Sequence, residues 1–169
     1  MIKLTHHLLI FFLLASLISL VSCTSTEVIR EVMDPKNLLS TKTKLDLTVN
    51  TSADLNPDQS GRPSPVVVRL YSLVSPTHFE NADFVSLYHN DQAVLGTDFL
   101  RKEEKDFQPS EKFSAQLDFN EKANFIGIMV AYQDIEQANW RLILPLERGK
   151  HNYLNIKLTA DSVLLEQEK

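Results

Sequence analysis

Apolar side chains recur at every second position in two well-separated stretches of the chain. They are Leu45, Leu47 and Val49 in the first stretch, and Phe113, Ala115, Leu117 and Phe119 in the second. Successive side chains of a β-strand point to opposite faces of its sheet, so this spacing gathers the apolar residues on one face. The chain is thereby constrained to sheets with one buried and one solvated face.

Further strands are predicted from runs rich in β-branched and aromatic residues. These runs are residues 66–73, 125–132, 140–144, 153–158 and a short 163–165. The runs at 66–73 and 125–132 are apolar on both faces, as in central strands. Turn residues separate the runs at short, regular intervals, which predicts an all-β fold of the β-sandwich type.

One segment departs from the period of two and predicts a helical insertion. Ser75 is suited to cap a helix whose first residue is Pro76, and Phe84, Leu87 and Tyr88 then follow the i, i+3, i+4 spacing of a helix face. We expect one or two short helices within residues 76–90. Residues 98–105 (DFLRKEEK) are expected to add another helical turn.

The aromatic residues of this region and of the strands allow two interpretations. Phe84, Leu87, Tyr88 and Trp140 could line a ligand cavity, but residues at helix or strand spacing more often fill the core, which is the interpretation favoured here. On a strand, Arg141 is expected to face away from Trp140 and to pair with Asp134 or with an acid on a neighbouring strand.

The first 23 residues read as an export signal. Lys3 precedes an apolar run over residues 8–20, which is shorter than the ~20 residues that span a bilayer. The run ends in Leu20-Val21-Ser22-Cys23, which resembles the lipobox of bacterial lipoproteins, where the cysteine is acylated and the signal is cut before it. The alternative is an ordinary signal with an incidental cysteine, but Cys23 is the only cysteine of the chain. Thr24, in place of an inner-membrane retention Asp, favours the outer membrane.

These features divide the chain into three parts. Residues 1–22 are the predicted signal peptide, 23–42 a lipidated N-terminus and polar tether, and 43–169 one β-sandwich domain. Without the signal, the chain has 147 residues with 16 Lys and Arg against 22 Asp and Glu, an acidic balance that argues against nucleic-acid binding.

Motifs for catalysis or cofactor binding are absent from the sequence. One cysteine cannot form an internal disulfide, and four scattered glycines form no phosphate-binding loop. His78, His89 and His151 lack metal-ligand spacing, and Ser64 lacks a G-x-S-x-G context. We therefore expect no enzyme activity, no metal, no cofactor and no small-molecule substrate.

The most unusual segment of the predicted domain is the connection over residues 50–65. It holds Pro57, Pro63 and Pro65 and is far longer than a hairpin turn. Proline reduces the entropy lost when a loop becomes ordered, so a preshaped binding loop is favoured over a flexible connector.

Several segments resemble the TssJ family, the outer-membrane lipoproteins of the type VI secretion system. They are residues 56–58 (NPD), 61–69 (GRPSPVVVR), 82–88 (ADFVSLY), 126–135 (IGIMVAYQDI) and 140–141 (WR), in order behind the lipobox. The resemblance implies a transthyretin-like two-sheet β-sandwich with a short helical insertion, facing the periplasm of a Gram-negative bacterium. It also implies binding to the periplasmic domain of the inner-membrane protein TssM, which shares a complex with TssL.

Within the predicted loop, Asn56, Asp58, Gly61 and Arg62 are the residues expected to contact TssM. Asp58 and Arg62 offer charge-assisted hydrogen bonds, and Gly61 permits a close backbone approach or a positive φ. The alternative function is a lipid-anchored periplasmic carrier of a small hydrophobic ligand, which requires a cavity inside the sandwich.

Overall fold

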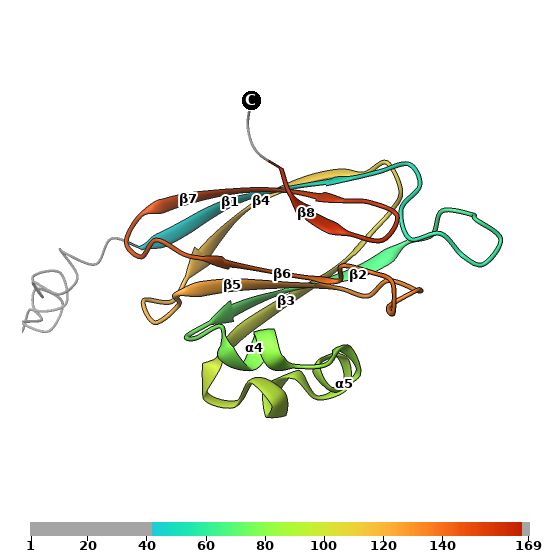
Figure 1. The fold of residues 1–169 in the computed structure, drawn as a ribbon. Coiled ribbons are helices and arrows are strands. Elements are labelled where there is room, and N and C mark those ends of the chain that lie inside the picture. Colours follow the sequence, from blue (N-terminus) through green and yellow to red (C-terminus); the bar gives the residue numbers. More distant parts are fainter. Residues whose placement is uncertain (1–41, 167–169) are drawn as a thin grey trace, which may run out of the picture. The chain divides into compact units, whose positions relative to one another are not determined.

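The computed structural model describes residues 42–166, which form a two-layer β-sandwich with a helical insertion. Figure 1 shows the two sheets stacked face to face. The strands are β1 (Thr43–Thr51), β2 (Val66–Leu73), β3 (Phe99–Phe107), β4 (Lys112–Phe119), β5 (Phe125–Val130), β6 (Arg141–Pro145), β7 (His151–Leu158) and β8 (Val163–Leu165). The helices are α4 (Thr77–Asn81), α5 (Phe84–Leu95) and the short 3-10 helix η2 (Gly96–Asp98). The predicted signal, Cys23 and all but the last residue of the tether lie outside the described residues.

Each layer is a four-stranded sheet. The first sheet has the strand order β4-β1-β7-β8, in which β1 pairs antiparallel with β4 and parallel with β7. The second has the order β3-β2-β5-β6 and is antiparallel throughout. The predicted all-β sandwich is confirmed, and every predicted strand is present.

The main core lies between the two sheets. From β1 it receives Leu45, Leu47 and Val49, all buried, as their alternation predicts. Val66, Val68 and Leu70 of β2 face them from the second sheet. The period of two therefore gathers one apolar face from each sheet into a common interior.

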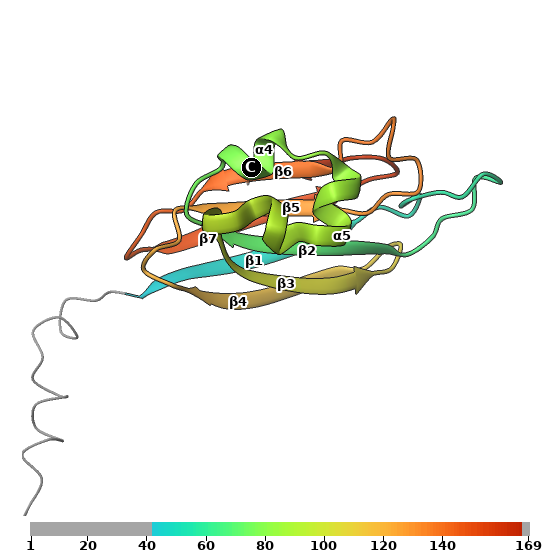
Figure 2. The ribbon, with the colours of Figure 1, turned by 90° about the horizontal axis from the view of Figure 1, so that it is seen from below.

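A second core lies on the outer face of the second sheet, where α4 and α5 cover it (Figure 2). It is built from Tyr71, Leu73, Phe79, Leu87, Leu95 and Met129, all fully buried. Gly127 of β5 allows this approach, since a Cβ placed there would lie 3.0 Å from a ring carbon of Phe79. The burial of both faces explains why β2 and β5 carry apolar residues on both faces.

The helical insertion begins one residue later than predicted. Pro76 occupies the N-cap of α4, and the hydroxyl of Ser75 accepts a hydrogen bond from the Thr77 amide at 3.3 Å. At α5 the Asp83 side chain caps the helix by accepting a hydrogen bond from the Ser86 amide at 2.9 Å. This helix continues to Leu95, beyond the predicted limit of residue 90, with a kink at Asn90.

The helical turn predicted for residues 98–105 is wrong, because most of this segment belongs to the edge strand β3. Lys, Arg and Glu favour helix in isolation, and charged residues also protect the free edge of a sheet. The tertiary structure decides the outcome. Lys102 pairs with Asp91 of α5 at 2.6 Å, and Glu104 pairs with Arg69 of the neighbouring strand β2 at 2.5 Å. The charged residues that predicted a helix therefore bind partners on α5 and on β2.

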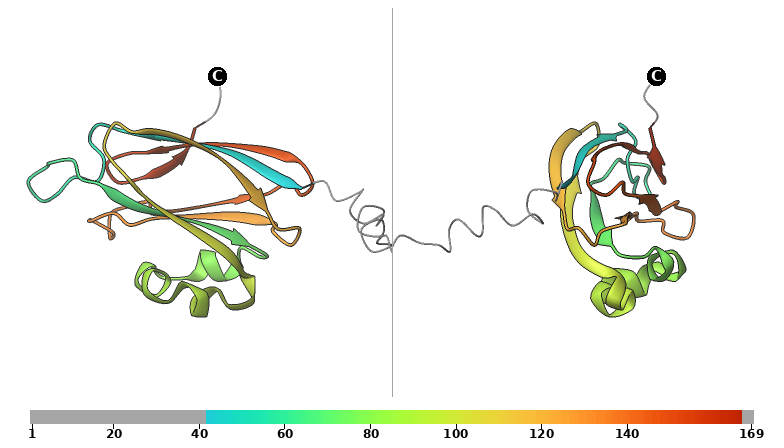
Figure 3. Two further views of the ribbon diagram at one scale, coloured as in Figure 1. Left: turned by 180° about the vertical axis from the view of Figure 1, so that it is seen from behind. Right: turned by 90° about the vertical axis from the view of Figure 1, so that its left-hand side faces the viewer.

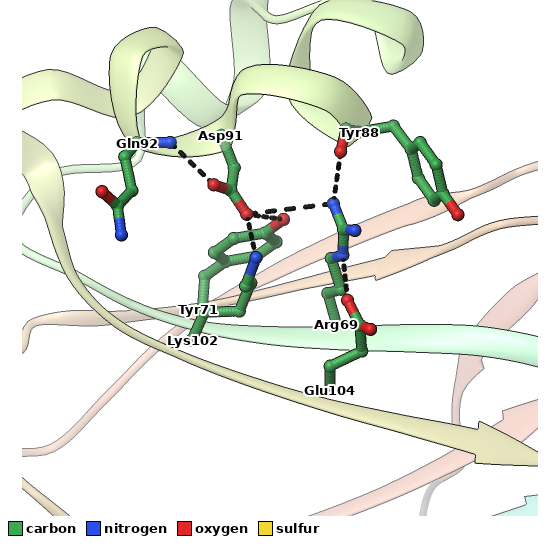
Figure 4. A network of polar contacts seen from close by, with 7 residues as sticks. All are labelled: Arg69, Tyr71, Tyr88, Asp91, Gln92, Lys102 and Glu104. Atoms are coloured by element: carbon green, nitrogen blue, oxygen red, sulfur yellow. Dashed lines mark hydrogen bonds and ion pairs between the residues drawn. The ribbon is translucent and has the colours of Figure 1, made fainter.

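A polar network fastens α5 to the second sheet (Figure 4). The Asp91 carboxylate accepts hydrogen bonds from the Tyr71 hydroxyl at 3.2 Å and from the Lys102 ammonium at 2.6 Å. Arg69 donates to the Tyr88 carbonyl at 2.6 Å, and its guanidinium lies 4.5 Å from the centre of the Tyr88 ring. Burial acts to raise the pKa of Asp91, but the hydrogen bond and charge of Lys102 outweigh it and lower the pKa.

Trp140 connects the two cores. It is half-buried, packs against residues of both, and contacts Phe84 edge-on with ring centres 5.3 Å apart. The expected partner of Arg141 is wrong: the guanidinium donates to the carbonyls of Phe79 and Ala82 at 3.3 and 2.9 Å. Arg141 therefore holds the end of α4 rather than pairing with an acid.

Candidate functional site

Three loops meet at one end of the sandwich. They are the β1–β2 loop (52–65), the β5–β6 connection (131–140) and the β7–β8 turn (159–162). Figures 1 and 3 show the β1–β2 loop projecting beyond the sheets at this end. Thr43, where the described chain enters β1, lies at the opposite end of that strand. We call this region the loop end.

Asn56 joins the three loops from inside. The residue is buried, with only 3% of its surface exposed to solvent. The side-chain oxygen accepts a hydrogen bond from the Gln133 amide at 2.8 Å, and the side-chain nitrogen donates to the Pro65 carbonyl at 2.7 Å. The Asn56 backbone amide donates to the Ala160 carbonyl at 3.1 Å. Asn56 also adopts a φ of 45°, a left-handed conformation that asparagine tolerates better than most residues.

The tip of the β1–β2 loop is closed by an ion pair between Asp58 and Arg62. The guanidinium lies 2.7 Å from the carboxylate, which also accepts hydrogen bonds from the backbone amides of Ser60 and Arg62. The amide and the side chain of Arg62 lower the pKa of Asp58. Gly61 completes the turn with a φ of 76°, which a side chain would strain.

The four residues predicted for this loop thus take different positions. Asp58, Gly61 and Arg62 come together at the tip, where the Arg62 side chain is 79% exposed and free to contact other molecules. Asn56 is buried beneath them and shapes the loop from within. Leu55 was not predicted to have a role, yet it is fully buried and anchors the loop in the main core. An isolated leucine in an otherwise polar loop is the feature of the sequence that could have indicated this anchor.

Beneath the tip the three loops enclose a recess with a volume of about 530 Å³. Its lining residues are Asn56, Pro57, Asp58, Gln59, Tyr132, Gln133, Asp134, Gln137, Ala160 and Asp161. Four of them belong to the predicted binding loop, and the others come from the β5–β6 connection and the β7–β8 turn, for which no binding role was predicted. Only the fold brings them together, because they are separated by up to about a hundred residues in the chain.

The histidines of the described region serve local contacts. The Nδ1 atom of His78 lies 2.5 Å from the Asp98 carboxylate, and the Nε2 atom of His151 lies 2.9 Å from the Asp46 carboxylate. The His89 ring contacts the Tyr88 ring edge-on. Within residues 42–166, no group of three or more His, Cys, Asp and Glu is arranged to hold a metal ion. In the same range, no helix has the length and apolar character needed to cross a membrane.

The fold places the chain among two-sheet β-sandwich proteins that carry a helical insertion on the outside of one sheet. Comparison with protein families identifies the lineage: residues 43–161 match the family described as "Type VI secretion lipoprotein, VasD, EvfM, TssJ, VC_A0113". The chain belongs to this family, whose members are structural components of the secretion system and not enzymes. No curated protein sequence gives a significant match.

Several solved structures have a similar fold. The type VI secretion lipoprotein TssJ1 from Pseudomonas aeruginosa is 28% identical with a TM-score of 0.71, and the match covers 76% of this chain and 99% of that one. Lip of Serratia marcescens, a membrane-bound component of the type VI secretion system, is 21% identical with the same TM-score and coverage. A structure described as the TssM C-terminal domain from EAEC also contains a match, at 23% identity, a TM-score of 0.61, and 75% and 99% coverage.

Proposed function

We propose that this lipoprotein is anchored in the outer membrane through acylated Cys23, faces the periplasm, and docks the trans-envelope complex of the type VI secretion system. Its partner in this role is the periplasmic domain of a TssM-type inner-membrane protein, which shares the complex with a TssL-type protein. The proposal also assigns residues 1–22 to a cleaved signal, 23–42 to a tether and 43–169 to the docking domain.

The position of the loop end carries this proposal. The chain enters β1 at Thr43 and reaches the β1–β2 loop after nine residues of extended strand, a distance of about 30 Å. The residue at which the chain enters the domain and the loop end therefore lie at opposite ends of β1. This leaves the loop end available to a partner from the inner membrane.

The chemistry of the loop suits recognition of a protein. The Arg62 guanidinium has donors to spare beyond those bound to Asp58, and arginine is enriched among residues that dominate interface energies. Hydrogen bonds hold the loop in shape, among them Asp58 amide to Arg62 carbonyl at 2.9 Å and Ser64 amide to Leu55 carbonyl at 2.9 Å. A preshaped loop loses little entropy on binding. Asp58, Gly61 and Arg62 are the proposed contacts, and Asn56 is the residue that positions them.

The alternative role, carriage of a small hydrophobic ligand, is less well supported. The apolar groove between the edges of β3 and β4 has a volume of about 240 Å³. Ligand pockets usually measure roughly 300–1,000 Å³, so this groove is small for a carrier site.

Titration of the soluble domain with the TssM periplasmic domain of the same bacterium, followed by calorimetry, tests the docking function. The Asp58→Ala, Arg62→Ala double variant and a loop shortened between Ser52 and Gly61 are expected to bind at least about tenfold more weakly. The matched control is Glu147→Ala with Lys150→Ala, which removes another exposed ion pair, in the turn between β6 and β7. Unchanged affinity in a folded, shortened variant would show that the loop is only a connector.

A further inference from the structure

The two sheets have four edge strands, and three of them are protected against pairing with another chain. β8 has three residues and β6 has five, ending at Pro145, and a bridge between Asn139 and Ser162 links these two edges at one end. In β3, six of the nine residues are charged, and its register with β2 is irregular at Leu73. The fourth edge strand, β4, has no such protection over its central residues 113–117, which include no charge and no proline.

β4 is also long, regular and free on one side. It pairs eight residues with β1 without a shift in register, and it lies along one rim of the sandwich (Figure 2). The Thr51 amide donates to the Glu111 carbonyl at 2.9 Å, so the odd-numbered residues here direct their backbone groups toward β1. The even-numbered residues therefore direct theirs to the free edge, where no strand of residues 42–166 pairs with them. These residues are Lys112, Ser114, Gln116 and Asp118, all exposed.

The charges of β4 are complementary to those of a second β4 in antiparallel orientation. When two copies are aligned about Ala115, Lys112 of each copy lies opposite Asp118 of the other. Within the described part of the chain, neither of these two side chains has an ion-pair or hydrogen-bond partner. Opposite charges directly across a strand pair stabilise it. A second copy therefore supplies the partners that a single copy lacks.

The apolar face of β4 is complementary in the same alignment. Phe113 of one copy then lies opposite Leu117 of the other. Both side chains are only half-buried and line the apolar groove between the edges of β3 and β4. A second strand at this edge removes part of their surface from water, which favours association. One alignment thus matches backbone, charges and apolar side chains together.

We propose that β4 is a self-association site, at which two copies of this chain pair antiparallel about Ala115. The two β4-β1-β7-β8 sheets then form one continuous sheet of eight strands. Because each copy uses the same edge, the pairing closes at a dimer and does not continue into a fibre. The inference does not depend on the docking function, since it uses no residue of the β1–β2 loop.

The first test places a cysteine at the centre of the pairing, in cells that express the full chain. Odd-numbered residues face each other in non-hydrogen-bonded pairs, with Cα atoms about 4.5 Å apart, which suits a disulfide. Two Ala115→Cys copies should therefore cross-link when oxidised with copper phenanthroline, giving a dimer on a non-reducing gel. The unmodified protein, with Cys23 alone, measures the background. Ala138→Cys is the matched control, because it alters another half-buried alanine beside the main core and should give no dimer above background.

The second test reverses the charges in the Ala115→Cys background. Lys112→Asp places like charges opposite each other at both ends of the pairing, and so does Asp118→Lys. Each change should lower the yield of cross-linked dimer by about fivefold or more. Their combination restores opposite charges and should recover the yield. Co-expression of the two single variants should give mixed dimers, which a tag on one copy identifies.

A dimer that is lost in each single reversal and recovered in the combination supports the self-association site. No dimer above the Ala138→Cys control overturns it. A dimer whose yield is unchanged by both single reversals overturns the proposed alignment. Cross-linking of Ala115→Cys to a different protein, in place of a second copy, also overturns the proposal and shows that β4 receives a partner strand.

Discussion

The side-chain oxygen of Asn56 accepts a hydrogen bond from the backbone amide of Gln133 at 2.8 Å, which links two loops that lie 77 residues apart in the sequence. The amide nitrogen of the same side chain donates to Pro65. One buried residue thus sets the shape of the β1–β2 loop and its position over the recess. The residues at the tip depend on it for their presentation.

Replacement of Asn56 with alanine should destabilise the domain by about 1–3 kcal/mol, because the Gln133 amide and the Pro65 carbonyl lose their buried partner. Chemical denaturation measures this loss. Asn56→Asp is the informative companion, since it keeps the acceptor for Gln133 and removes the donor to Pro65. Its stability should lie between those of the unmodified protein and Asn56→Ala. Equal stability of all three proteins would contradict the role given to Asn56.

Gly127→Ala tests the docking of α4 on the second sheet. The added Cβ would meet Phe79 at 3.0 Å and Leu73 at 3.1 Å, both in the second core, so we expect a loss of about 1–3 kcal/mol from overpacking. Gly61→Ala serves for comparison. It meets nothing within 4 Å and is strained only by its φ of 76°, so its cost should be nearer 1 kcal/mol. Calorimetric melting of both variants decides whether the crowding is real.

The Asp91 network predicts a pH dependence of stability. The pKa of the Asp91 carboxyl is lower in the folded protein than in the unfolded chain, where it is about 3.9. The stabilisation is therefore complete above this value and is lost as the pH falls through the folded pKa. Asp91→Asn should lower the free energy of unfolding by about 1–3 kcal/mol at pH 7 and by much less near pH 2. Urea titrations at the two pH values give the comparison, and a constant difference between the two proteins would argue against the network.

Trp140→Ala should reduce the free energy of unfolding by about 2–3 kcal/mol, less than for a fully buried tryptophan, because the ring is half-buried. The loss is expected in both cores, since Trp140 contacts Phe84 as well as residues between the sheets. Amide hydrogen exchange in α5 and in β5 locates it. Faster exchange in only one of these elements would show that Trp140 does not connect the two cores.

Cys23→Ser tests the anchor. If the cysteine carries the acyl chains, the variant should accumulate as an unprocessed or soluble species and fail to support secretion, whereas the unmodified protein fractionates with the outer membrane. Ser22→Ala serves as a control, because it changes the neighbouring residue and keeps the cysteine. A Cys23→Ser protein recovered as the mature form in the outer membrane would rule out the lipid anchor.

Local patterns were sufficient for most of the fold but not for the site. The alternation at Leu45, Leu47 and Val49 predicted β1, since burial on one face forces that spacing. Residues 98–105 misled because their charges are neutralised by Asp91 and Arg69, which lie elsewhere in the chain. The recess could not be predicted either. Tyr132 and Asp161 come into proximity only when β5 and the β7–β8 turn are placed by the two sheets.

The double pairing of β1 has a mechanical consequence. This strand forms eight residue pairs with β4 on one side and eight with β7 on the other, and it runs from Thr43 to the loop end. A pull on the chain at Thr43 against a protein held at the loop end acts along the strand, perpendicular to its hydrogen bonds with β4 and at a slant to those with β7. Both ladders would then have to shear together, whereas a hairpin pulled from one end opens one bond at a time. The sandwich is built to bear tension between a tether and a docked load.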